Sequence, residues 1–169
     1  MDQLVRNLYR CLIGLSCLSM VAAFLIVVLS ILSRQITFIN LQGLDAYAGY
    51  AIVATLFFAL PTTLLHGDHI RVTLVLDRLS ARGRAVMEWG GLLVALALSV
   101  YTAWYAIRLV WLSYITHDVS AAADASPLWI PQLSMAIGCI AFAIAFGHAI
   151  VARWQGREWF LAGSQAATE

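Results

Sequence analysis

The chain has 169 residues, of which 62% are hydrophobic and only 11% are charged, and its formal net charge is +1. Soluble domains are about 45–50% apolar and about 25% charged, so this composition excludes an ordinary soluble domain and favours residence in a membrane. Because the net charge is close to zero it identifies no partner, and we expect no binding to nucleic acid.

Four stretches are long and apolar enough to cross a bilayer as helices, which takes about 20 apolar residues. They run over residues 11–32, 46–65, 89–112 and 128–152, approximately. The first is too long for a typical signal-peptide core and lacks a small-residue cleavage site, so we expect it to be retained. Pro61 is expected to kink the second helix, whereas Pro131 suits the first turn of the fourth. The sequence thus predicts an all-α integral membrane protein with four transmembrane helices in a single membrane domain, residues 1–169.

All ten basic residues are arginines, and their distribution predicts the topology. Eight of them precede the first stretch, separate the second from the third, or follow the fourth: Arg6, Arg10, Arg71, Arg78, Arg82, Arg84, Arg153 and Arg157. Basic residues concentrate on the cytoplasmic side of membrane proteins. We therefore expect both termini in the cytoplasm, with the chain in a bacterial or archaeal inner membrane.

The connection between the second and third stretches is too long for a simple turn. Apolar residues recur there at i, i+3, i+4 and i+7, namely at Val72, Val75, Leu76 and Leu79. This spacing predicts an interfacial amphipathic helix over about residues 69–84. The alternative is a solvated connector helix.

Five residues are predicted to anchor the chain at the inner membrane interface. Arg71, Arg78 and Arg82 share a side of the predicted interfacial helix that differs from its apolar side, and would face lipid phosphates. Trp89 and Trp154 fall at the expected inner boundary of the hydrocarbon, where tryptophan is enriched.

Arg108 is the only charge within a predicted span, and no acidic residue lies in any of the four. It follows Trp89 by 19 residues, about 28 Å along a helix, which places it near the outer interface. Its side chain has three possible partners: a lipid phosphate, Asp118, or a partner subunit. Proton-coupled carriers generally need a buried carboxylate, so the chain is poorly equipped to transport alone.

Histidine positions leave one alternative function open. A haem-bearing four-helix anchor of an electron-transfer complex needs histidines on facing helices, and both His66 and His148 fall toward the inner side. His66 and His69 form the only close pair, without a nearby cysteine, so we expect no metal or other cofactor in this chain. No nucleophile–base arrangement or phosphate loop is visible, so we expect no enzyme activity.

Small residues recur every three or four positions on two of the predicted helices. The rows are Gly91, Ala95, Ser99 and Ala103 on the third, and Ser134, Gly138, Ala141, Ala145 and Ala149 on the fourth. Small residues let helix backbones approach closely in lipid. The rows either close the four-helix bundle on itself or form an interface with a partner.

Residues 69–79, His-Ile-Arg-Val-Thr-Leu-Val-Leu-Asp-Arg-Leu, closely resemble the signature of one family. It is the small membrane subunit (DctQ-type) of tripartite ATP-independent periplasmic (TRAP) transporters. The stretch from Ser126 to Pro131, leading to Gly138, is also similar to the family's start of the fourth span. The length, the four spans and the cytoplasmic termini agree, so the resemblance covers nearly the whole chain.

The resemblance implies a scaffold role without catalysis. A periplasmic binding protein would deliver an organic acid, of the C4-dicarboxylate or sugar-acid class, to a large membrane subunit that performs sodium-driven uptake. The small subunit would bind and stabilise the large one, and sodium would bind in the large subunit. Four residues are candidate partner contacts: Arg34, Arg108, Asp118 and Asp124.

Overall fold

The computed structural model describes residues 2–35, 43–65, 81–122 and 125–155, and these residues are nearly all helical. The four helices are α1 (Asp2–Gln35), α2 (Leu44–Leu65), α4 (Ala81–Ile115) and α5 (Trp129–Trp154). Each is long and apolar enough to span a membrane. The prediction of an all-α membrane protein with four transmembrane helices is confirmed.

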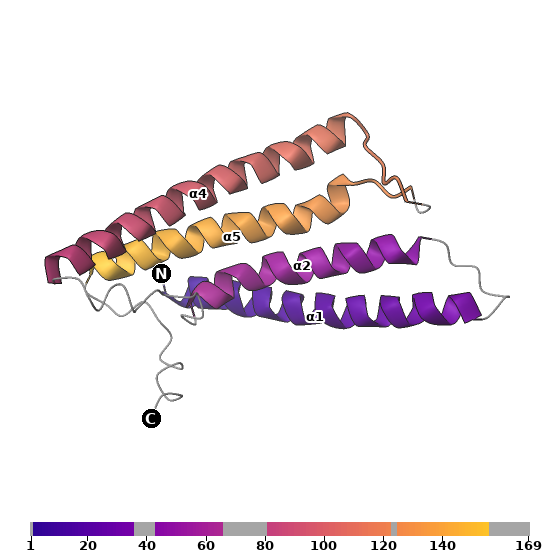
Figure 1. Cartoon of the computed structure of the whole chain (residues 1–169), viewed down its shortest axis with the longest axis horizontal. Helices are drawn as coiled ribbons and strands as arrows, with labels where there is room; N and C mark the ends of the chain where they lie inside the picture. Colours follow the sequence, from indigo (N-terminus) through magenta and orange to yellow (C-terminus); the bar gives the residue numbers. More distant parts are fainter. Residues whose placement is uncertain (1, 36–42, 66–80, 123–124, 156–169) are drawn as a thin grey trace, which may run out of the picture.

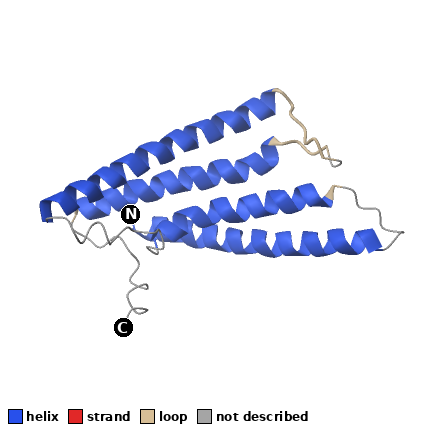
Figure 2. Ribbon diagram, in the orientation of Figure 1, coloured by secondary structure: helices blue, strands red, loops and turns tan. Residues whose placement is uncertain are grey.

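The helices form two antiparallel pairs that lie side by side (Figures 1 and 2). One hairpin consists of α1 and α2, and the other of α4 and α5. Helices α2 and α5 pack against each other at the centre, so α1 and α4 lie on the two outer sides. We call the end with the start of α1 and the end of α5 the terminal end, and the opposite end the hairpin end.

The central contact between α2 and α5 depends on a proline and a glycine. Pro61 is fully buried within α2 and has no N–H, so the carbonyl of Phe57 lacks its usual helical donor. Gly138 of α5 faces that carbonyl: a Cβ added at Gly138 would lie 2.5 Å from the Phe57 oxygen. The missing side chain lets α5 approach, and the glycine Cα–H groups can serve as weak donors there.

Both rows of small residues turn toward the inside of the bundle. On α5 the row is buried from Gly138 onward, and Ala145 and Ala149 are at most 1% exposed. On α4, Ser99 and Ala103 are buried and Ala95 packs against the core, whereas Gly91 is exposed. The sequence left two roles open for these rows, packing within the bundle or contact with a partner. From Ala95 on α4 and from Gly138 on α5, the small residues pack within the bundle.

The predicted interfacial helix lies mostly outside the described residues. Its final part, residues 81–84, belongs instead to the start of α4, which continues without interruption to Ile115. Helix α4 is thus longer at its start than the predicted third span, which began at Trp89. By length and composition alone, the candidate spans are Ala85–Ile115 in α4, which includes Glu88, and Leu44–Leu64 in α2, which includes Asp45, whereas the narrower spans predicted from the sequence contained no acidic residue.

Candidate functional site

At the terminal end, an ion pair joins the two helices of the second hairpin. Arg153 of α5 donates to a carboxylate oxygen of Glu88 on α4, and both side chains are about three-quarters buried. The Arg153 guanidinium also lies 5.8 Å from the ring centroid of Trp89. A charge in apolar surroundings is costly unless it is paired, so this contact fixes α4 against α5.

At the hairpin end, a different ion pair joins α1 to α2. Arg34 donates to Asp45 over 2.6 Å, and the hydroxyl of Ser30 donates to the same carboxylate over 2.7 Å. The charged side chains of this pair are 69% and 72% exposed. Exposed pairs of this kind contribute little to stability, about 0–1 kcal/mol.

The connection between α4 and α5 is ordered around a short bridge between Val119 and Pro127. The hydroxyl of Ser126 donates to that of Tyr50 on α2 over 3.3 Å, which links this connection to the first hairpin. Tyr114 at the end of α4 meets the ring of Trp129 edge-on, at 5.7 Å between centroids. The hairpin end therefore has polar contacts suited to a membrane surface.

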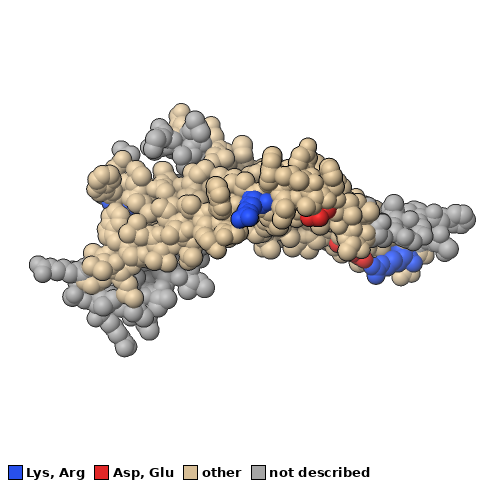
Figure 3. Space-filling model, turned by 90° about the horizontal axis from the view of Figure 1, so that it is seen from above, with Lys and Arg blue, Asp and Glu red and all other residues tan. Residues whose placement is uncertain are grey.

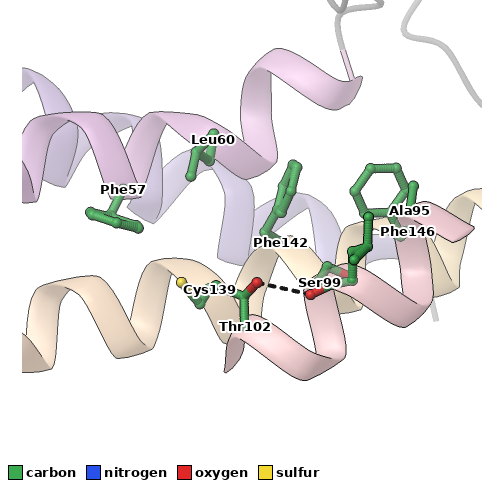
Figure 4. Close-up of a pocket in the computed structure, with 9 residues that line it drawn as sticks. Phe57, Leu60, Ala95, Ser99, Thr102, Cys139, Phe142 and Phe146 are labelled. Carbon is green, nitrogen blue, oxygen red and sulfur yellow. Dashed lines mark hydrogen bonds between the residues drawn. The ribbon is translucent and has the colours of Figure 1, made fainter. Parts of the chain in front are cut away.

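A partly open cavity of about 300 Å³ lies between α2, α4 and α5 (Figure 4). Apolar groups surround it, including Phe57 from α2 and Phe142 from α5, and none of its described lining residues is charged. Ser99 and Thr102 also line it, but their hydroxyls donate to carbonyls of their own helix. The cavity can accept an apolar group and offers little to bind an organic acid.

The two outer helices present different surfaces. The large hydrophobic side chains that α1 exposes, such as Leu18 and Met20, are aliphatic apart from Phe24. Helix α4 exposes Tyr101, Trp104 and Trp111 in addition to aliphatic residues. Figure 3, which views the molecule from the α4 side, shows a broad uncharged surface interrupted by few charged side chains. Arg108 is exposed on α4.

The structure describes three of the four candidate contact residues predicted from the sequence. Arg34 pairs with Asp45 of its own chain. Arg108 and Asp118 are both exposed and do not form an ion pair with each other. Asp124 lies outside the described residues. No ion pair therefore joins the three described candidates, Arg34, Arg108 and Asp118, to one another.

Three of the five predicted membrane anchors lie in the described residues. Trp154, at the end of α5, is 84% exposed, and Trp89 is half-buried beside Arg153. Arg82 lies in the first turn of α4. Arg71 and Arg78 fall outside the described part of the chain, so their role as lipid anchors stays a prediction.

Among the described residues, no group of three histidine, cysteine or acidic side chains is placed to hold a metal ion. His66 and His69 lie outside these residues, which leaves the predicted histidine pairing untested. The Nδ1 atom of His148 is buried and has no hydrogen-bond partner among the residues that the structure describes.

Sequence reasoning missed the contact between Glu88 and Arg153, although a signal was present. Each charge directly precedes a predicted interfacial tryptophan, Trp89 or Trp154, so both were expected at the same membrane surface. Their helices are consecutive spans of the chain, so they cross the membrane in opposite directions, and consecutive elements usually lie next to each other. Opposite charges at the same depth on neighbouring helices were therefore a recognisable pair.

The chain matches a known protein family. The model of the family described as "Tripartite ATP-independent periplasmic transporters, DctQ component" matches residues 23–156, which include part of α1 and the whole of the other three helices. Neither the curated proteins nor the solved structures gave a match to the chain.

Proposed function

We propose a function that proceeds from one premise: this chain belongs to the DctQ family, the small membrane component of TRAP transporters. As such it is a multi-pass membrane subunit of a tripartite transporter. We infer that it is the scaffold for the large membrane subunit, which it binds and stabilises. The large subunit would carry out sodium-driven uptake of an organic acid that a periplasmic protein delivers.

The family match over residues 23–156 is the observation that carries this proposal. The packing of the described helices is in keeping with it. Gly138 and Ala145 close the centre of the bundle, and its partly open cavity is lined by apolar groups. A C4-dicarboxylate or a sugar acid needs positive or hydrogen-bonding partners. We therefore assign the substrate and sodium sites to the large subunit, and neither a cofactor nor catalysis to this chain.

The proposed placement is the bacterial or archaeal inner membrane, with both termini in the cytoplasm. The arginine distribution supports this orientation. Arg71, Arg78 and Arg82 would bind anionic lipid at the cytoplasmic surface. Changing all three to glutamine should lower the yield of the assembled complex and the amount of chain in the membrane. Unchanged yield and uptake in this variant would remove the lipid-anchor role.

Co-purification tests the scaffold role directly. The tagged chain is expressed in its native host, extracted in mild detergent, and its stoichiometric partners are identified by mass spectrometry. We expect a multi-span protein of the TRAP large-subunit type. A chain that emerges alone, or with a flavoprotein and a haem absorption band, would overturn the proposal and favour the electron-transfer anchor.

A further inference from the structure

One face of α4 combines aromatic residues with an arginine in the part of the helix nearer the hairpin end. It comprises Tyr101, Trp104, Tyr105, Arg108 and Trp111, and we call it the aromatic face of α4. These positions recur at i, i+3, i+4, i+7 and i+10, so they share one side of the helix. Trp104 and Trp111 are 67% and 64% exposed, which shows that no described element covers this side.

The outward side of α1 provides an internal reference for a lipid-facing surface. It is as exposed as that of α4, but its large exposed side chains are aliphatic, apart from Phe24. No charged residue lies on α1 between Arg10 and Arg34. Lipid tails need only such an aliphatic surface, so the polar and aromatic groups on α4 require a separate explanation.

The depth of Tyr101 and Trp104 separates this part of the aromatic face from an ordinary interfacial belt. Tyr101 follows Trp89 by 12 residues and Trp104 by 15, or about 18 and 22 Å along the helix. With Trp89 at the inner boundary, as predicted from the sequence, both would lie inside a hydrocarbon core that is about 30 Å thick. Tryptophan and tyrosine normally sit at the boundaries, where N–H and O–H groups find partners. Within the described chain nothing accepts a hydrogen bond from the Trp104 indole.

Arg108 strengthens the case for a protein partner. None of the described acidic residues pairs with it. Side chains on a helix lean toward its N-terminus, so the stem of Arg108 starts toward Trp104 and the middle of the membrane. A guanidinium that keeps this direction, rather than reaching a lipid phosphate at the outer interface, needs a carboxylate or free carbonyl groups, because hydrocarbon offers neither.

We propose that the aromatic face of α4 is the surface on which the large membrane subunit docks, and that this subunit offers an acceptor to Arg108. The inference rests on the proposed function and identifies the surface that performs it. Tryptophan, tyrosine and arginine are the residues that dominate binding energy in protein interfaces. The outward side of α1 is then left to lipid.

Site-specific photocross-linking in the assembled complex tests this assignment. A photoreactive phenylalanine analogue replaces Trp104 on α4 in one variant and Phe24 on α1 in a matched control. We expect position 104 to cross-link to the large subunit and position 24 to yield lipid adducts. Lipid adducts alone at position 104, or large-subunit adducts at position 24 alone, would overturn the assignment.

Substitutions provide a second, quantitative readout. Trp104→Ala should reduce recovery of the large subunit on the tagged chain about tenfold, as expected for a central interface residue. Arg108→Gln should also reduce it, and Arg108→Lys should restore it in part because the charge remains. Phe24→Ala is the matched control and should leave recovery unchanged. Equal recovery with all four variants would overturn the docking surface.

The same experiments separate this inference from the proposed function. If the unsubstituted chain recovers no large subunit, the scaffold function itself fails. If it recovers the large subunit, but position 104 cross-links only to lipid, the function stands and the docking surface is wrong. Size-exclusion profiles of each variant show whether a loss reflects misfolding, which an exposed side chain such as that of Trp104 should not cause.

Discussion

The two hairpins of this protein are built from similar apolar helices but are joined in different ways. In the first hairpin, α1 meets α2 through the exposed pair of Arg34 and Asp45. In the second, α4 meets α5 through Glu88 and Arg153, which are largely buried. Their outer sides also differ, since that of α1 is aliphatic and that of α4 carries aromatic residues and Arg108.

This difference shows how exposure changes the role of a charge in a membrane protein. Water and salt weaken an exposed pair, so removing it changes little. A largely buried charge must keep its partner, because losing one member leaves the other unpaired in apolar surroundings. The ion pair of the second hairpin should therefore contribute more to stability than that of the first.

The largest effect should come from forcing the two hairpins apart. Gly138→Val places a side chain against the backbone of Phe57, where a Cβ would already be 2.5 Å from the carbonyl oxygen. We expect a loss of about 3 kcal/mol in the free energy of unfolding. Titration with SDS in mixed micelles, followed by circular dichroism, measures it.

Gly147→Val on the same helix is the matched control, because a Cβ there meets nothing within 4 Å. It should cost far less than Gly138→Val. Equal losses in the two variants would show that the helix, rather than the contact between hairpins, is sensitive to valine.

A comparison of the two ion pairs should give the next largest effect. Glu88→Gln leaves Arg153 without its counter-charge in a partly buried position, and we expect a loss of about 2 kcal/mol. Asp45→Asn in the exposed pair should cost about 0.5 kcal/mol. The same SDS titration measures both. A larger loss for Asp45→Asn would reverse the assigned roles of the hairpins.

The smallest effect on stability should come from removing a hydrogen bond between the two helices of the first hairpin. Ser16 on α1 donates to the carbonyl of Thr55 on α2 over 2.9 Å. Ser16→Ala should cost about 0.6 kcal/mol, the average for such bonds in membranes. Ser99→Ala is the control, since that hydroxyl donates within its own helix to Leu96. If both variants lose equally, the bond across the hairpin adds nothing to the stability of α1.

The sequence predicted the transmembrane helices well because each segment enters the bilayer according to its own hydrophobicity. A run of about 20 apolar residues must form a helix in lipid, since its backbone groups have no other partners. This rule yielded four spans, and the motif at residues 69–79 yielded the family. The start of α4 was placed at Trp89 rather than Ala81, because the polar residues there resembled a separate surface helix.

The sequence was a poorer guide to which side of each helix faces the interior of the bundle. Leu93 and Leu96 have the same side chain on α4, yet Leu93 is 54% exposed and Leu96 packs against the core. In water a polar side would mark the outside of a helix, but lipid accepts apolar residues on every side. The hydrophobic pattern therefore could not distinguish the interior of this bundle from its surface.

The sequence by itself thus determined the number of spans, the membrane class and the family, because these follow from local hydropathy and one motif. Tertiary structure decided that Gly138 meets the Phe57 carbonyl, that Glu88 pairs with Arg153, and that the rows of small residues face inward. It also decided that Trp104 faces outward. These features depend on which sides of two helices meet. Lipid solvates every side of an apolar helix equally well, so close packing and paired charges determine which sides come together.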